Sequence, residues 1–228
     1  MTSQETLAQI RARAVRSYRH GGGSRPDVLV VRHQDGLAVL KDHNACDPGF
    51  ARLIGPLLAW REGRALERLA GLTGIPRLLG RPDSRSLLME YLDAEPAIRR
   101  TVPVAWPEYF AALEQLVARM HEHGVAHCDL RSPPNMLVDA QGRPYLVDFV
   151  ACVFQGRRWN VPARYLFERF REVDRAGIAK LKSRVAPALL TLGESALLDH
   201  KSVFARALRW MGARVRDLSR MLLTKRGG

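Results

Sequence analysis

The chain has 228 residues, enough for one large domain or two small lobes around a hydrophobic core. Hydrophobic residues make up 46% of the chain, a proportion that excludes an intrinsically disordered protein. Its 36 Lys and Arg residues outnumber 23 Asp and Glu residues, and the net charge of +13 favours an anionic partner: a nucleotide, a phosphorylated sugar, a nucleic acid or an acidic membrane surface.

Cysteine usage and hydropathy indicate the cellular compartment in which the protein is expected to act. The three cysteines are widely spaced and include no CxxC pair, so we expect no disulfide framework and a reducing environment. The N-terminal stretch has no apolar core typical of a signal peptide, and no uncharged run is as long as a membrane span. These features predict a cytoplasmic protein that is at most peripheral at the inner face of the membrane.

The N-terminal third contains one helical pattern and two strand patterns. Residues 3–18 carry apolar side chains at helical spacing, which predicts a short amphipathic helix. The glycine run 21–23 lacks the G-x-G-x-x-G pattern of a phosphate-covering loop, so we interpret it as a flexible linker. The β-rich runs 27–32 and 37–41 are joined by an Asp-Gly pair, which predicts a hairpin.

The middle of the chain contains helical patterns and strand patterns in turn. Residues 50–70 have the pattern of one long amphipathic helix. Two short strands, 78–80 and 86–91, flank a turn. A proline-rich segment, 93–107, is expected to be irregular. A clear helix is predicted over 107–123, ending before a glycine.

The C-terminal third is predicted to be helical and is rich in arginine. Residues 162–186 have a helical pattern, and 188–199 is expected to be a short loop followed by a helix. Residues 202–222 have a regular apolar face opposite a basic one. This last helix could pack its apolar face against the rest of the chain, or its basic face could contact an anionic membrane or partner. We interpret His121 and His123, near the end of the preceding long helix, as exposed.

Residues 127–150 carry the most informative pattern, HCDLRSPPNMLVDAQGRPYLVDFV. Two short apolar runs flank a polar turn, which predicts a strand pair that brings Asp129, Asn135 and Asp148 around one point. Each of these residues alone would more often cap a turn. Together, two carboxylates and an amide can hold Mg²⁺ and leave one carboxylate to accept a proton from an attacking hydroxyl. This combination suits phosphoryl transfer.

The order H-C-D-L-(x)4-N followed by D-F-V resembles the catalytic loop and metal-binding motif of the protein-kinase superfamily. The nearest relatives suggested by the pattern are compact bacterial kinases, of the RIO type and of the lipopolysaccharide core (Kdo/heptose) type. The chain departs from the family pattern twice. The loop from Asp129 to Asn135 is one residue longer than usual, and Val150 stands where the family usually has glycine.

The resemblance implies an α+β, two-lobed protein-kinase-like fold. The small lobe would comprise residues 1–92, with a sheet and the long helix. The mainly helical lobe would comprise residues 93–228, with the catalytic loop at 127–135 and the metal-binding motif at 148–150. The cofactors implied are ATP and Mg²⁺.

The resemblance also assigns roles to single residues. Lys41 would bind the α/β-phosphates, held by a glutamate of the long helix, and the spacing favours Glu62 over Glu67. Asp129 would act as the catalytic base, and His127 would shape the loop by hydrogen bonds. The metal ligands would be Asn135 and Asp148. The adenine contacts would come from Met89, Glu90, Tyr91 and Leu92.

These roles predict an ATP-dependent kinase that phosphorylates a hydroxyl-bearing, anionic acceptor. A lipopolysaccharide core sugar and a protein Ser/Thr are both consistent with the sequence. The alternative is a nucleotide-binding pseudokinase regulator, which the missing glycine pattern, the lengthened loop and Val150 favour. No helix-turn-helix or aromatic RNA-binding signature is present, so we do not expect a nucleic-acid partner.

Overall fold

The computed structural model describes residues 5–34, 36–100, 103–156 and 159–199. These residues form two compact units. The first contains residues up to 64 together with 77–92, and the second contains 65–76 and the described residues from 93 onward. The first unit is built around an antiparallel sheet and the second is mainly helical, which confirms the predicted α+β class. The lobe boundary at residue 92 stays a prediction.

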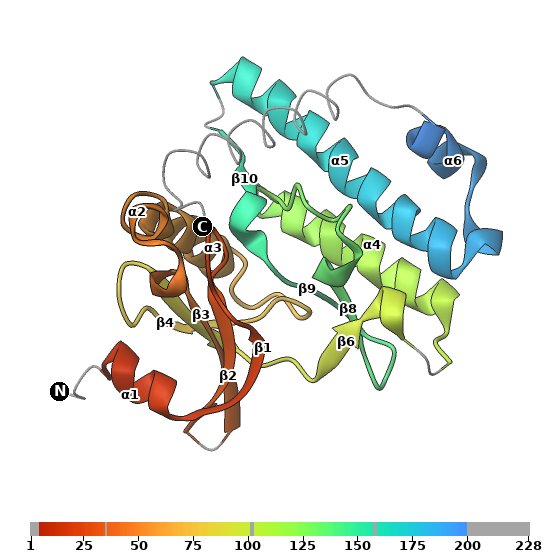
Figure 1. Cartoon of the computed structure of the whole chain (residues 1–228). Coiled ribbons are helices and arrows are strands. Elements are labelled where there is room, and N and C mark those ends of the chain that lie inside the picture. Colours follow the sequence, from red (N-terminus) through yellow and green to blue (C-terminus); the bar gives the residue numbers. More distant parts are fainter. Residues whose placement is uncertain (1–4, 35, 101–102, 157–158, 200–228) are drawn as a thin grey trace, which may run out of the picture. The chain divides into compact units, whose positions relative to one another are not determined.

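The first unit is organised by a five-stranded antiparallel sheet in the order β1-β2-β3-β5-β4 (Figure 1). The strands are β1 (Ala14–Arg19), β2 (Asp27–His33), β3 (Gly36–Asp42), β4 (Leu78–Gly80) and β5 (Ser86–Glu90). The predicted hairpin and the predicted pair of short strands are thereby confirmed. Ile10 of α1 (Leu7–Ala12) is buried against the apolar side chains of β2, β3 and β5.

The helix predicted over residues 3–18 is wrong beyond residue 12. Thr6 and Gln9 form a capping box that starts α1, but the chain then enters β1 and pairs with β2. The pairing satisfies the backbone groups of a segment that contains Val15 and Tyr18, which are both side chains that suit strands. Local helical spacing was therefore overridden by strand pairing.

The glycine run is also not a flexible linker. It forms a tight connection between β1 and β2, in which Gly22 and Arg25 exchange two backbone hydrogen bonds of 3.0 Å. The N–H of Gly21 donates to the carboxylate of Asp27 at 2.6 Å, and the N–H of Gly23 donates to Asp47 at 3.1 Å. These bonds hold the run in one defined conformation.

The single helix predicted over residues 50–70 is two helices. α2 (Pro48–Leu53) ends one residue before α3 (Gly55–Arg68) begins. Pro56 lies in the first turn of α3 and has no N–H to continue the hydrogen-bond ladder of α2. The break lies at the position where proline prevents a continuous helix.

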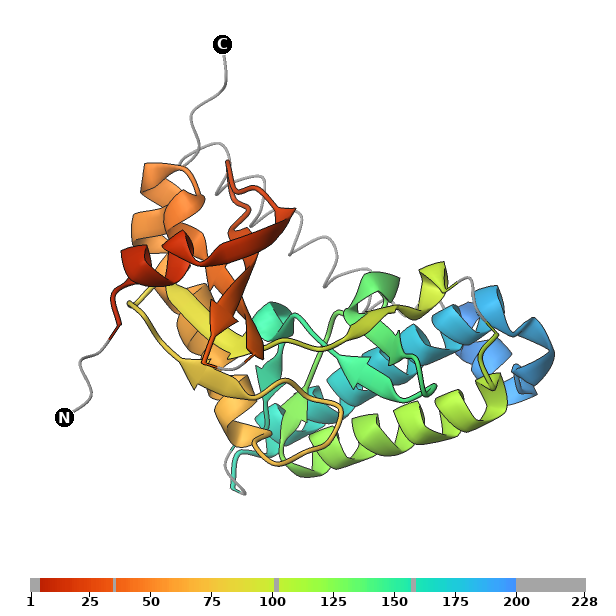
Figure 2. The same cartoon turned by 90° about the horizontal axis from the view of Figure 1, so that it is seen from below.

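Among its described residues, the second unit contains three complete α-helices and two small sheets. The helices are α4 (Trp106–Glu122), α5 (Val161–Val185) and α6 (Leu192–Asp199), and α4 and α5 run side by side (Figure 2). The first sheet has the order β6-β8-β9, from β6 (Ala94–Pro96), β8 (Met136–Asp139) and β9 (Pro144–Leu146). The second pairs β7 (Val125–Ala126) with β10 (Val153–Phe154). The segment predicted to be irregular, 93–107, thus contains the strand β6.

Short 3-10 helices connect these elements. They are η1 (His43–Ala45), η2 (Ala97–Arg99), η3 (Pro133–Asn135), η4 (Phe149–Ala151) and η5 (Pro187–Leu189). Within the described ranges, no helix has both the length and the apolar composition needed to cross a bilayer. The predicted amphipathic helix at 202–222 lies outside the described residues.

The attachment of α1 to the sheet can be tested through Ile10, which is only 3% exposed. We expect Ile10→Ala to lower the free energy of unfolding by about 2–4 kcal/mol, because it leaves a cavity between α1 and the sheet. Urea denaturation monitored by circular dichroism measures this. The control is Leu53→Ala, at a position that is 62% exposed, which should change stability by less than about 0.5 kcal/mol. Equal effects of the two variants would contradict the packing.

Candidate active site

A buried ion pair joins β3 to α3 in the first unit. Nζ of Lys41 lies 2.8 Å from Oε2 and 3.0 Å from Oε1 of Glu62, and both side chains are buried. Glu67, the other candidate glutamate, is exposed. A buried pair of this kind adds little net stability, because removing two charges from water costs about as much as their attraction returns. It fixes the direction of the lysine side chain instead.

The proposed adenine-lining residues lie at the end of β5. Met89 is 8% exposed and pairs with Val39 of β3. The N–H of Glu90 donates to the carbonyl of Arg77 at 2.9 Å, so this donor is already used within the fold. Ligand contacts in this segment would therefore have to come from other backbone groups, such as those of Tyr91 and Leu92.

The catalytic loop brings two of the predicted residues into direct contact. Nδ2 of Asn135 donates to both the carbonyl oxygen (3.1 Å) and Oδ2 (3.0 Å) of Asp129. The N–H of Val147 donates to the carbonyl of Asn135 at 3.1 Å, which brings the residue before Asp148 alongside the loop. The extra residue of the loop is taken up in η3, where the N–H of Asn135 bonds the carbonyl of Ser132.

His127 begins the catalytic loop and is completely buried. Its Nε2 lies 3.0 Å from the carbonyl oxygen of Val147, and its Nδ1 accepts from the N–H of Asp129 at 3.3 Å. This pattern fits the tautomer with the proton on Nε2, since a carbonyl can only accept. The ring also packs against Phe149, with 4.7 Å between ring centroids. His127 is thus a positioning residue that joins the catalytic loop to the segment carrying Asp148.

The sequence reasoning missed Asp174, a completely buried carboxylate in α5. Its Oδ2 accepts from the N–H of His127 at 2.8 Å and lies 2.9 Å from Nε2 of His121. Its Oδ1 accepts from the N–H of Cys128 at 2.8 Å. The prediction that His121 is exposed is therefore wrong, because its ring is buried against this carboxylate. The available signal was an acidic residue on the apolar face of a helix.

Two backbone conformations at the site are unusual for residues with side chains. Cys128 has φ 66° and Asp148 has φ 68°, both in the left-handed region that favours glycine. Residues other than glycine persist there only where the surroundings hold them. For Cys128 the support is the hydrogen bond to Asp174, and for the segment around Asp148 it is the bonds to His127 and Asn135.

The protonation behaviour of Asp129 follows from its surroundings. Burial raises the pKa of this carboxyl above its ordinary value, and the neighbouring Asp148 carboxylate acts in the same direction, whereas the hydrogen bond from Asn135 opposes both. A carboxylate with a raised pKa is a stronger base and accepts a proton from a hydroxyl group more readily.

The residues present fit a divalent cation only when phosphate oxygens complete its coordination. Nδ2 of Asn135 is engaged by Asp129, which leaves its Oδ1 as an acceptor beside the segment of Asp148. Across the described residues, no group of three or more His, Cys, Asp and Glu side chains could hold a metal by itself. Mg²⁺ usually takes one or two protein ligands and obtains the rest from water and substrate phosphates. The donor set agrees with that mode of binding.

Comparisons with known proteins agree with the kinase resemblance. A family model described as the RIO domain matches residues 42–159, which is more than half of the chain. The match contains Glu62, Asp129, Asn135 and Asp148, and it begins one residue after Lys41. The search of curated proteins gives no match.

Two solved structures of the Rio2 kinase from Chaetomium thermophilum are similar. The first matches 91% of this chain and 77% of that protein, with a TM-score of 0.53 and 18% sequence identity. The second, a complex with ADP, Mg²⁺ and phosphoaspartate, matches 92% and 75%, with a TM-score of 0.54 and 19% identity. At this identity the likeness establishes the fold, which confirms the predicted kinase-like class.

The role of Asp174 can be tested by Asp174→Asn. The amide has nearly the same shape, but its NH₂ group cannot accept the hydrogen bonds that one carboxylate oxygen receives. We expect a loss of about 3 kcal/mol in the free energy of unfolding, because buried N–H donors lose their acceptor. Chemical denaturation measures this. The control is Glu172→Gln on the exposed side of the same helix, and a loss no larger than in that control would contradict the proposed anchoring.

Proposed function

Because the chain belongs to the RIO domain family, we propose that it is an ATP-dependent phosphotransferase that transfers the γ-phosphoryl group of ATP to a hydroxyl acceptor. The observation that carries the proposal is the hydrogen-bonded arrangement of Asp129 and Asn135 alongside the segment of Asp148. The family model alone would be compatible with a protein that has lost activity. The retained side chains and their orientation support catalysis.

The proposed roles follow from what each group can do. Lys41, fixed by Glu62, would neutralise phosphate charge. Asn135 and Asp148 would hold Mg²⁺, which, when bound, offsets the negative charge of the phosphates. Asp129 would orient the acceptor hydroxyl and take up its proton. Met89 and the backbone groups of residues 90–92 other than the N–H of Glu90 would contact the adenine.

The chemical class of the acceptor is a further part of the proposal. A hydroxyl on a protein Ser/Thr and a hydroxyl on a phosphorylated lipopolysaccharide core sugar both fit the chemistry of Asp129. The net charge of +13 favours an acceptor that already carries negative charge. Incubation with γ-labelled ATP and a cell extract, separated into protein, lipid and small-molecule fractions, distinguishes the two by the fraction that becomes labelled.

We also propose that the protein acts in the cytoplasm, in contact with the inner face of the membrane only through the basic face predicted at 202–222. The basis is its charge and cysteine usage. Sedimentation with vesicles of phosphatidylglycerol, compared with phosphatidylcholine vesicles, tests the contact. Equal sedimentation with both would contradict an electrostatic membrane contact.

A nucleotide-binding pseudokinase is the second candidate. Val150 at the glycine position of the motif and the lengthened loop support it. The two candidates differ in their dependence on Mg²⁺. A thermal shift with ATP that is independent of Mg²⁺, without release of ADP, would favour the regulator. A shift that requires Mg²⁺ and is accompanied by turnover would favour the kinase.

The catalytic assignment predicts that Asp129→Asn and Asp148→Asn each lower kcat/KM for phosphoryl transfer by at least about a hundredfold. The first variant removes the base, and the second removes a metal ligand. Steady-state assays with labelled ATP measure the loss, and circular dichroism checks that the variants are folded. Wild-type activity in either folded variant would reject the assignment.

The role of the ion pair can be tested by comparing variants of two glutamates on the same helix, α3. Glu62→Gln should lower kcat/KM by at least about tenfold, because Lys41 loses the carboxylate that fixes its direction. Glu67→Gln, at an exposed position of α3, should leave kcat/KM within about twofold. The same assay compares both variants, and a loss confined to the Glu67 variant would reassign the partner of Lys41.

A further inference from the structure

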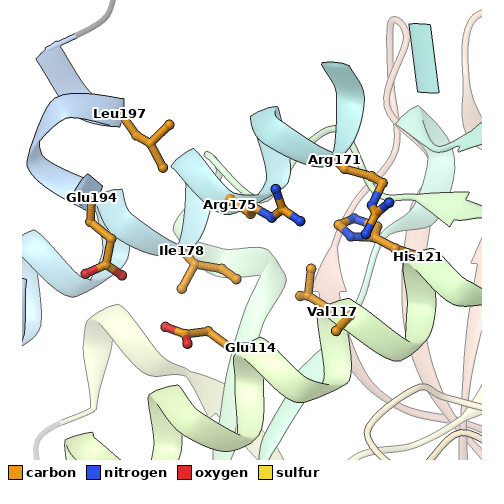
Figure 3. Close-up of a pocket in the computed structure, with 9 residues that line it drawn as sticks. Glu114, Val117, His121, Arg171, Arg175, Ile178, Glu194 and Leu197 are labelled. Atoms are coloured by element: carbon orange, nitrogen blue, oxygen red, sulfur yellow. The ribbon is translucent and has the colours of Figure 1, made fainter. Parts of the chain in front are cut away.

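A cavity of about 270 Å³ lies between α4, α5 and α6, entirely within the second unit (Figure 3). Its volume is near the lower end of the range of about 300–1,000 Å³ that small-molecule sites occupy. The residues proposed for catalysis and nucleotide binding do not line it. The cavity is therefore a candidate for a second ligand.

The two acidic side chains of the cavity share one lysine. Oε1 of Glu114 and Oε1 of Glu194 lie 2.9 Å and 2.5 Å from Nζ of Lys182. Thr191 donates two further hydrogen bonds to Glu194. Although burial works against both charges, these bonds raise the pKa of Lys182 and hold the pKa of Glu194 below its ordinary value. This end of the cavity is therefore already occupied by an ammonium group, and the two carboxylates with one lysine leave a net charge of −1 there.

The basic side chains of the cavity have fewer hydrogen-bond partners than the acidic ones among the described residues. Figure 3 shows Arg171, Arg175 and His121 grouped on the side of the cavity away from Glu194. Nη1 of Arg171 binds the Glu168 carboxylate, but its Nε is buried and has no acceptor among the described residues. Arg175 is exposed and makes no hydrogen bond or ion pair within the described part of the chain. Some guanidinium N–H groups at the basic end of the cavity therefore have no acceptor among the described residues.

We propose that this cavity binds a small organic anion. Its carboxylate or phosphate group accepts hydrogen bonds from Arg175 and Arg171, which suit planar bidentate contacts. Its apolar body packs against Val117, Ile178 and Leu197, which also line the cavity. A ligand with an anionic head and a short apolar body matches both halves of the lining.

The cavity is connected to the catalytic loop by one chain of contacts. His121 lines the cavity, and its Nε2 bonds Asp174. The same carboxylate accepts the N–H groups of His127 and Cys128, directly before Asp129. A ligand that orders His121 therefore orders Asp174 and the start of the loop. The effect on catalysis rests on the proposed function, whereas binding and loop ordering do not.

The binding is tested by calorimetric titration of the full chain with phenyl phosphate and benzoate, with benzylamine as the matched cation and inorganic phosphate as the head group alone. We expect saturable binding of the two aromatic anions, weaker binding of inorganic phosphate and none of benzylamine. Preference between phenyl phosphate and benzoate identifies the head group. Absence of saturable anion binding, or equal binding of benzylamine, would overturn the proposal.

Variants assign the binding to this cavity. Arg175→Gln should weaken phenyl phosphate at least about tenfold, since a charge-assisted contact is lost. Ala118→Phe, at an exposed lining position of α4, should abolish binding by filling the space. The control is Arg164→Gln, an exposed arginine of α5 outside the cavity, which should bind as the wild type does. Unchanged affinity in Arg175→Gln would show binding elsewhere and sink the assignment.

Amide hydrogen exchange tests the connection to the loop. Saturating phenyl phosphate should slow exchange at the N–H groups of His127 and Cys128, and Arg175→Gln should remove the effect. No change at these two amides, with binding intact, would reject the connection. Neither measurement uses ATP, so a failure here is distinct from a failure of the kinase assignment.

Discussion

The carboxylate of Asp174 is the group on which the arrangement of the catalytic loop depends. A completely buried charge is tolerated only when hydrogen bonds replace its hydration, and here backbone N–H groups and a histidine ring supply them. The carboxylate thereby fixes two successive peptide groups of the loop, including Cys128 in its left-handed conformation. Asp129 follows directly in the chain, so these hydrogen bonds fix the position of its backbone.

Close packing supports the same arrangement. Gly177 lies one helical turn after Asp174, and a Cβ there would come within 2.6 Å of the carbonyl carbon of Leu130. α5 therefore lies directly against the backbone of the loop, and only glycine allows this approach. Anchoring at Asp174 and contact at Gly177 together hold both sides of Asp129. The buried Lys41–Glu62 pair has a comparable role in the first unit, because it orients a side chain that would otherwise be free to rotate.

The sequence predicts those parts of the fold that local periodicity determines. The hairpin of β2 and β3, helix α4 and the strands around the catalytic loop follow from alternating or helical spacing. Residues 14–18 were misassigned because their helical spacing is compatible with a strand, and only pairing with β2 decides between the two. Asp174 and the burial of His121 could not be predicted, because their partners are about 50 residues apart in the sequence and meet only when α4 and α5 pack together. The composition of a helix face indicates that an acid is buried, but not which donors it meets.

The lengthened loop shows why sequence spacing alone is a weak guide to catalytic competence. Insertion of one residue would displace Asn135 if the loop were fixed at only one end. Here both ends are fixed, since Asp174 holds the start and Asn135 is bonded to Asp129 and to the N–H of Val147. Pro133 and Pro134 begin η3, and their restricted φ angles suit this compact turn, so the additional residue is accommodated between the two fixed points. A change in loop length therefore need not separate Asn135 from Asp129. The competence of such a loop depends on whether these hydrogen bonds persist, rather than on the number of residues between the two side chains.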